Sequence, residues 1–135
     1  MKIKITHLIL PYSFFLLSMQ YSVGQTLSNS DQDKKLIIGS WLSEDDNSWK
    51  LAFTSNNHCN EYINNVLSNT YTFVISNTTP QCGIDVDMNI NTDYLQLKNV
   101  NDSTDIRCYL IYGVTDKSLS ISPLGIGSAF IFDKQ

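Results

Sequence analysis

From Gly39 onwards, apolar and polar residues alternate with a period of two, which is the pattern of half-buried β-strands. Short stretches rich in Asn, Ser, Asp and Gly, the residues that favour turns, separate the alternating runs. The pattern predicts eight short strands, at 40–43, 49–53, 58–63, 71–75, 95–97, 105–112, 119–121 and 130–132. The segments 64–69 and 113–116 are predicted to be turns. No helix longer than one turn is expected.

Regularly spaced short strands without intervening helices favour a β-sandwich or a β-barrel over an α/β fold. The chain has 135 residues, which is enough for one domain. We therefore expect a single all-β domain.

The first 24 residues have the features of a cleavable signal peptide. Lys2 and Lys4 precede an apolar run at 8–17, and small residues occupy positions 22 and 24. The run is too short for a membrane span, which needs about 20 apolar residues, and no later run is long enough. The sequence thus predicts a signal peptide at 1–24, a flexible leader at 25–38 with one helical turn at 34–38, and a domain at 39–135. The protein is expected to be secreted or periplasmic, with no membrane insertion.

Charge argues against nucleic acid as a partner. The chain has nine basic and thirteen acidic residues, and loss of Lys2 and Lys4 leaves seven basic residues. Arg107 is the only arginine, and the chain has no basic run. Nucleic acids and anionic membranes attract clustered Lys and Arg, so neither is an expected partner.

Three cysteines follow the predicted signal: Cys59, Cys82 and Cys108. An exported protein favours disulfide formation, and three cysteines allow one bridge and one free thiol. Cys108 is expected on the outer face of its strand, where the turn that contains Cys82 can reach it. We therefore favour Cys82–Cys108, and Cys59–Cys108 and Cys59–Cys82 remain as alternatives.

Gly39-Ser40-Trp41 opens the first predicted strand, and the segments 108–115, 119–122 and 130–134 cover most of the last three. This Gly-x-Trp motif and these closing segments resemble those of the lipocalin-like (calycin) family, in particular its small exported Bacteroidetes members. The resemblance implies one eight-stranded antiparallel meander barrel. It also implies that Lys134 lies over the indole of Trp41 and closes one end of the barrel, a cation–π contact worth about 0.5–1 kcal/mol.

The resemblance further implies a binding module for a small hydrophobic ligand. An eight-stranded barrel is just wide enough to be filled by its own side chains or to hold one small ligand. The aromatic residues expected to line either a cavity or a solid core are Trp49, Phe53, Tyr71, Phe73, Tyr109 and Phe130. The alternative is a solid-core barrel that binds a protein or a glycan through its surface.

Candidate chemical sites are weak. His58, Cys59 and Glu61 are residue types that can bind a metal or form a nucleophile with its base, and His58 and Glu61 are expected on one face of the strand. The favoured interpretation is nevertheless a polar edge of a hairpin. The stretch 85–93 carries oxygen-bearing side chains at every second position. It has Ile90 and Gln96 where a calcium-binding EF-hand loop needs Gly and Glu, so a solvated edge strand or loop is favoured.

The run 44–46 is acidic and is interpreted as a solvated loop. We therefore predict no enzyme activity, no metal and no cofactor.

Overall fold

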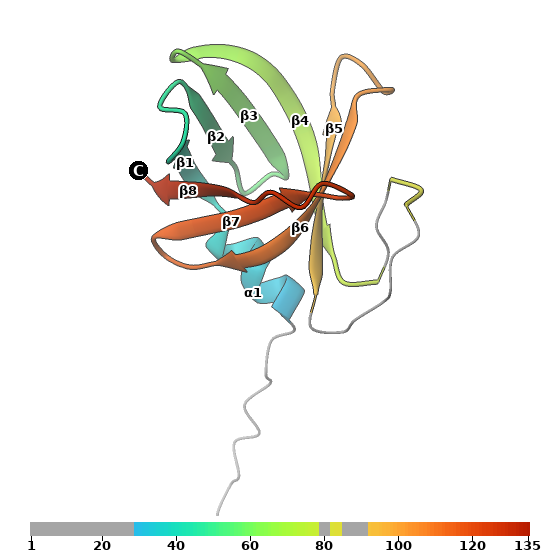
Figure 1. Ribbon diagram of the computed structural model, residues 1–135. Coiled ribbons are helices and arrows are strands. Elements are labelled where there is room, and N and C mark those ends of the chain that lie inside the picture. The colour runs from blue at the N-terminus through green and yellow to red at the C-terminus, as the bar shows by residue number, and fades with distance from the viewer. Residues whose placement is uncertain (1–28, 79–81, 85–91) are drawn as a thin grey trace, which may run out of the picture.

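The computed structural model describes residues 29–78, 82–84 and 92–135, and its eight strands form one closed antiparallel barrel (Figure 1). Each strand pairs with the next along the chain, and β8 pairs with β1. The all-β fold with eight strands in a meander is therefore confirmed. The strands are β1 (Gly39–Ser43), β2 (Trp49–Phe53), β3 (His58–Ile63), β4 (Val66–Ser76), β5 (Asp93–Asn99), β6 (Ile106–Val114), β7 (Ser118–Pro123) and β8 (Phe130–Lys134).

Alternate residues of every strand point into the barrel and form its core. This arrangement explains the period of two in the sequence, since successive strand residues face opposite sides of a sheet. The largest fully buried side chains are Trp41, Tyr71, Phe132, Ile37, Leu51, Leu95, Leu97, Leu119, Ile121 and Cys59.

A helix, α1 (Asn29–Leu36), lies across one end of the barrel (Figure 1). The residue that follows it, Ile37, is fully buried, and its carbonyl accepts a 2.7 Å hydrogen bond from Trp41 Nε1. The expectation of a flexible leader with one helical turn is therefore wrong for residues 29–38. Residues 1–28, which include the predicted signal peptide, lie outside the described residues.

The predicted contact between Trp41 and Lys134 is present at this helix end. Lys134 Nζ lies 5.0 Å from the centre of the Trp41 ring and donates to the carbonyl of Leu36 at 3.2 Å. Gly39 sits beneath this lysine with φ of +134°, and a Cβ placed there would lie 2.7 Å from Lys134 Cε. The glycine of the Gly-x-Trp motif is thus needed for both backbone conformation and space.

The turn predicted at 64–69 is only two residues long. Asn64 and Asn65 both have positive φ, 51° and 63°, and β4 begins at Val66. Two consecutive positive φ values are typical of the tight hairpin turn that Asn tolerates. The expectation of a longer turn is wrong because Val66 and Leu67 extend the strand beyond the run that alternates.

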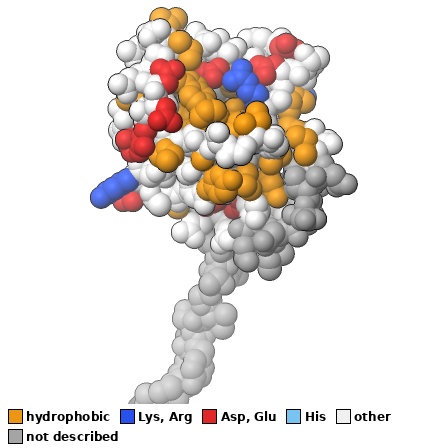
Figure 2. Space-filling view, in the orientation of Figure 1, with side chains coloured by type: hydrophobic (Ala, Val, Ile, Leu, Met, Phe, Trp, Pro, Cys, Tyr) orange, Lys and Arg blue, Asp and Glu red, His pale blue; other side chains and the backbone are white. Residues whose placement is uncertain are grey.

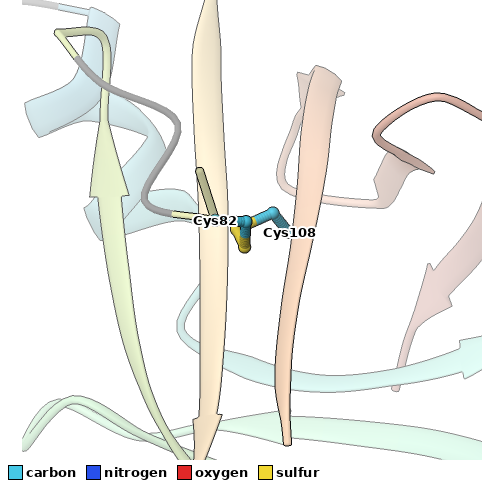
Figure 3. Close-up of a disulfide and its surroundings, with 2 residues drawn as sticks. All are labelled: Cys82 and Cys108. Carbon is cyan, nitrogen blue, oxygen red and sulfur yellow. A yellow bond between two sulfur atoms is a disulfide. The ribbon is translucent and has the colours of Figure 1, made fainter. Parts of the chain in front are cut away.

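A disulfide joins Cys82 to Cys108, as predicted (Figure 3). The two Cα atoms are 6.1 Å apart, and 26 residues separate the cysteines in the sequence. The bridge attaches the connection between β4 and β5 to the outside of β6. The third cysteine, Cys59, is free and buried inside the barrel. Within the described part of the chain, no helix is long and apolar enough to cross a membrane.

Candidate binding site at the distal end of the barrel

The distal end of the barrel lies opposite α1 and is formed by the turns at 44–48, 64–65, 100–105 and 124–129. Glu61, on β3, points inward just below this end and is only 6% exposed. Its Oε1 accepts hydrogen bonds from Trp49 Nε1 at 3.1 Å and from Arg107 Nη1 at 3.2 Å. Its Oε2 accepts from Asn69 Nδ2 at 2.9 Å and from the Tyr71 hydroxyl at 3.2 Å. One carboxylate thus joins side chains from β2, β4 and β6.

Arg107 is the positive charge of this network. Its Nε donates to Asp105 Oδ1 at 3.2 Å, and its guanidinium lies 4.9 Å from the centre of the Tyr71 ring. The side chain stays 36% exposed while that of Glu61 is 8% exposed. Arg107 therefore presents a fixed guanidinium to solvent from a largely buried ion pair.

Two asparagines extend the network. Asn99 Nδ2 donates to Asn69 Oδ1 at 3.2 Å and to Asp105 Oδ2 at 3.1 Å. Asn99 is buried at the end of β5, and its Oδ1 accepts from the backbone N–H of Asn101. These bonds fix the carboxylate of Asp105, which in turn orients Arg107.

Burial and charge shift the titration of the neighbouring groups. Burial raises the pKa of Tyr71, and the negative charge of Glu61 raises it further. Burial also raises the pKa of Tyr109, which Arg107 partly offsets. For Arg107, burial alone would lower the pKa, but Glu61, Tyr71 and Asp105 raise it overall. Both tyrosines are therefore neutral hydrogen-bonding groups at neutral pH, beside a permanent cation.

Aromatic rings frame the polar network. The ring of Trp49 packs edge-on against Phe130 and Phe132, with centroids 5.1 Å and 4.9 Å away. Trp49 and Phe130 are half-buried, in contrast to Phe132. The hairpin between β3 and β4 adds exposed apolar side chains at Ile63, Val66 and Leu67. The distal end thus combines a few convergent polar groups with an apolar surround.

The six aromatic residues expected to line a cavity or core fall into two groups. Trp49 and Phe130 lie at the distal end. Phe53, Tyr71, Phe73 and Tyr109 lie deeper and are 2%, 0%, 5% and 7% exposed. Water reaches almost none of these four side chains, and Phe53 and Phe73 pack edge-on at 5.2 Å. These four side chains therefore belong to the deep part of the barrel core.

The structure separates the three residues of the weak nucleophile candidate. Cys59 and Glu61 point inward, whereas His58 is part-exposed and its Nδ1 lies 3.0 Å from the Asn56 carbonyl. The expectation that His58 and Glu61 share a face is wrong, because residues three apart in a strand face opposite sides. Burial strongly raises the pKa of the Cys59 thiol, so the thiolate is disfavoured.

The remaining candidates are resolved in part. Glu44, Asp45 and Asp46 are exposed in the turn between β1 and β2, as expected. Most of the stretch 85–93 lies outside the described residues, but Asp93 is described and is a buried residue of β5, not a solvated one. In the described ranges, no three His, Cys, Asp or Glu side chains gather where they would hold a metal ion.

The sequence did not identify Arg107, Asp105, Asn69 or Asn99 as site residues. One signal was available in the sequence. Arg107, Tyr109 and Ile111 are alternate residues of one strand, so Arg107 faces inward as the other two do. An inward cation requires a partner, and Glu61 has the inward parity of Cys59. Their pairing across 46 residues depends on the strand register and cannot be inferred from spacing.

A second concave surface lies on the outside of β6 and β7. It is a groove of about 350 Å³, and its lining residues are Leu110, Tyr112, Ser122, Pro123, Leu124, Gly125, Ile126 and Gly127. Tyr112 and Ile126 are 61% and 62% exposed. Hydrophobic side chains gather on the side of the molecule shown in Figure 2. None of the groove residues is charged, so the groove suits a neutral partner.

Comparison with known proteins returned no match: no family model, no curated protein and no solved structure is significantly similar to this chain. The fold is therefore described from its own topology, and the site from its own residues.

Proposed function

We propose that this protein is an exported, lipocalin-like binding module that holds a small, mainly apolar ligand at the distal end of its barrel. The observation that carries the proposal is the half-exposed Arg107 guanidinium, which Glu61 and Asp105 fix at the same end of the barrel as the apolar rings of Trp49 and Phe130. Small-molecule sites are typically apolar surfaces with a few precisely placed polar groups.

The energetic cost of the network supports a functional interpretation. A buried ion pair is often no more stabilising than apolar residues of the same volume. A barrel that only needed a solid core could end in Leu or Phe at these positions. Groups that remain polar and partly open to solvent are available to orient a ligand.

Export is part of the same proposal. The predicted signal peptide at 1–24 and the disulfide between Cys82 and Cys108 both suit an oxidising compartment, the periplasm or the exterior. The resemblance of Gly39-Ser40-Trp41 and of the closing strands to lipocalin-like domains supports the choice of ligand class.

Mass spectrometry of the processed protein, under native and then denaturing conditions, tests the proposal. We expect an adduct of a few hundred daltons that is lost on denaturation. Arg107→Gln and Trp49→Ala should each reduce its occupancy. Lys98→Gln, which removes an exposed cation from the outer face of β5, is the matched control and should leave occupancy unchanged. An adduct that persists in both distal-end variants would place the ligand elsewhere.

The packing around Phe53, Tyr71, Phe73 and Tyr109 favours a second candidate function. In this alternative the barrel is solid, and the outer groove beside Tyr112 and Ile126 binds a neutral protein or glycan surface. A clean mass without adduct, together with array binding of glycans or peptides that is lost in Tyr112→Ala, would support this function over the first.

A further inference from the structure

Asp93 has an unusual environment beneath α1. It begins β5, is 3% exposed, and its Oδ1 accepts a 2.6 Å hydrogen bond from the Ser30 hydroxyl of α1. Its Oδ2 is the one buried side-chain oxygen of the described residues that has no hydrogen-bond partner. A buried carboxylate oxygen without a donor is costly, so a missing donor has to be sought nearby.

Asp33, one turn after Ser30 on α1, is within hydrogen-bonding reach of Asp93. Two ionised carboxylates only accept hydrogen bonds and repel each other, whereas a protonated one donates. The pKa of Asp33 is raised to about 7, and burial is the largest cause. The hydrogen bond with Asp93 and the negative charge of Asp93 raise the pKa of Asp33 further.

Among the described residues, neither Asp33 nor Asp93 forms a salt bridge, and Lys35 of α1 is exposed. On α1, Lys34 lies 3.9 Å from Asp31, and both side chains are half-exposed. Lys134 bonds to the carbonyl at the opposite end of the helix. The helix packs against β4 and β6, whose segments 71–76 and 109–114 contain tyrosines but no Lys, Arg or His. On the neighbouring turn, His58 faces the Asn56 carbonyl.

We propose that α1 is a pH-sensitive cap on the helix end of the barrel, held closed by one proton that Asp33 shares with Asp93. Protonated Asp33 donates its O–H to the unpartnered Oδ2 of Asp93. Loss of that proton leaves two adjacent carboxylates and weakens the docking of the helix.

The helix is anchored in a way that permits such an opening. Its C-terminal end is fixed by the bonds of Trp41 and Lys134 to the carbonyls of Ile37 and Leu36. Its N-terminal half depends on Ser30 and Asp33. A hollow of about 210 Å³ between α1 and β4 already reaches Phe73 and Ile75 of the core. Displacement of the first turns of α1 would therefore open the core at this end.

The direction of the pH effect follows from the raised pKa. The Asp33 pKa rises from 3.8 to about 7 when the helix docks. The stabilisation is therefore complete below pH 3.8, declines as the pH rises towards 7, and is absent above it. The cap is closed under mildly acidic conditions and loosens under neutral to alkaline ones.

Hydrogen exchange of the α1 amides in the processed protein, at pH 5 and pH 8.5 and corrected for intrinsic exchange rates, tests the proposal. We expect protection of residues 29–36 to fall roughly tenfold at the higher pH, a value reduced for solvent screening because Asp33 is only part-buried. Asp33→Asn keeps a donor without a charge, so its protection should stay high at both pH values.

Asp31→Asn, an exposed position on the same helix, is the control and should retain the pH dependence of the wild type. Equal protection at both pH values in the wild type would overturn the proposal, as would an unchanged pH dependence in Asp33→Asn. The exchange is repeated with EDTA and with calcium. If calcium restores protection at pH 8.5, the carboxylate pair is a cation site and the shared-proton cap is wrong.

Discussion

At the scale of single residues, Glu61 controls the distal end of the barrel. Among the described residues, four side chains donate hydrogen bonds to it: the indole of Trp49, the guanidinium of Arg107, the amide of Asn69 and the hydroxyl of Tyr71. A carboxylate can accept from four donors, but an amide cannot. The geometry therefore requires a charged acceptor at this position.

Replacement of Glu61 by Gln tests this requirement. The amide group of Gln would face other donors and leave Arg107 without its buried partner. We expect a loss of about 2–4 kcal/mol in the free energy of unfolding, measured by urea denaturation. Glu44→Gln, in an exposed turn, should change it by less than about 0.5 kcal/mol. A loss in Glu61→Gln as small as this control would show that the network does not stabilise the fold.

Gly39 gives a second residue-scale prediction. Its φ of +134° is strained for any residue with a side chain, and its Cβ position is occupied by Lys134. We expect Gly39→Ala to destabilise the protein by about 1–3 kcal/mol in urea denaturation. Gly127→Ala, where no atom lies within 4 Å of the added Cβ, is the matched control. Similar stability of the two variants would contradict the account of the Gly-x-Trp motif.

At the scale of elements, the disulfide couples the β4–β5 connection to the outer face of β6. Without it, the unfolded chain gains the freedom of a loop of about 25 residues. In the chain-entropy model this costs about 3 kcal/mol. We expect Cys82→Ser/Cys108→Ser to lose that amount in the free energy of unfolding.

Thiol labelling checks the pairing independently. In the oxidised wild type, iodoacetamide followed by peptide mass spectrometry should label Cys59 alone, and only after denaturation, because its thiol is buried. Labelling of Cys82 or Cys108 in the oxidised, denatured protein would show that the bridge is absent or differently paired.

The elements also show what alternation along the sequence can and cannot predict. Seven of the eight strands contain the whole run predicted for them, and β6 contains all of its run except Asp105, because most inward-facing positions in a barrel are apolar. The β3–β4 hairpin was misjudged because the register shifts between Glu61 and Tyr62, which interrupts the alternation. The sequence predicts only one turn of α1, because the helix is short and polar. Ser30, Asp33 and Ile37, the residue that follows the helix, hold it on the barrel in place of an apolar face. The ion pair of Glu61 with Arg107 depends on the closure of the barrel, which no local pattern reveals.

At the scale of the whole molecule, the question is whether the barrel is filled. The deep aromatic residues are almost unexposed, and Phe53 packs edge-on against Phe73. If side chains fill the barrel, a small ligand can bind only at its distal end. If the barrel can expand, the ligand can also bind inside it. The two cases differ in the cost of removing a deep side chain.

Phe73→Ala distinguishes the two cases. In a filled barrel the variant loses the transfer free energy of the ring and leaves a cavity, so we expect a loss of about 3–5 kcal/mol in the free energy of unfolding. Phe130→Ala, at the half-buried distal end, should cost less because solvent can occupy the space. Val74→Ala, whose parent side chain is 48% exposed on the outer face of the same strand, is the control and should be near neutral. A loss below about 1 kcal/mol in Phe73→Ala would mean that the ring lines a space that is not filled, and the ligand site would then extend into the barrel.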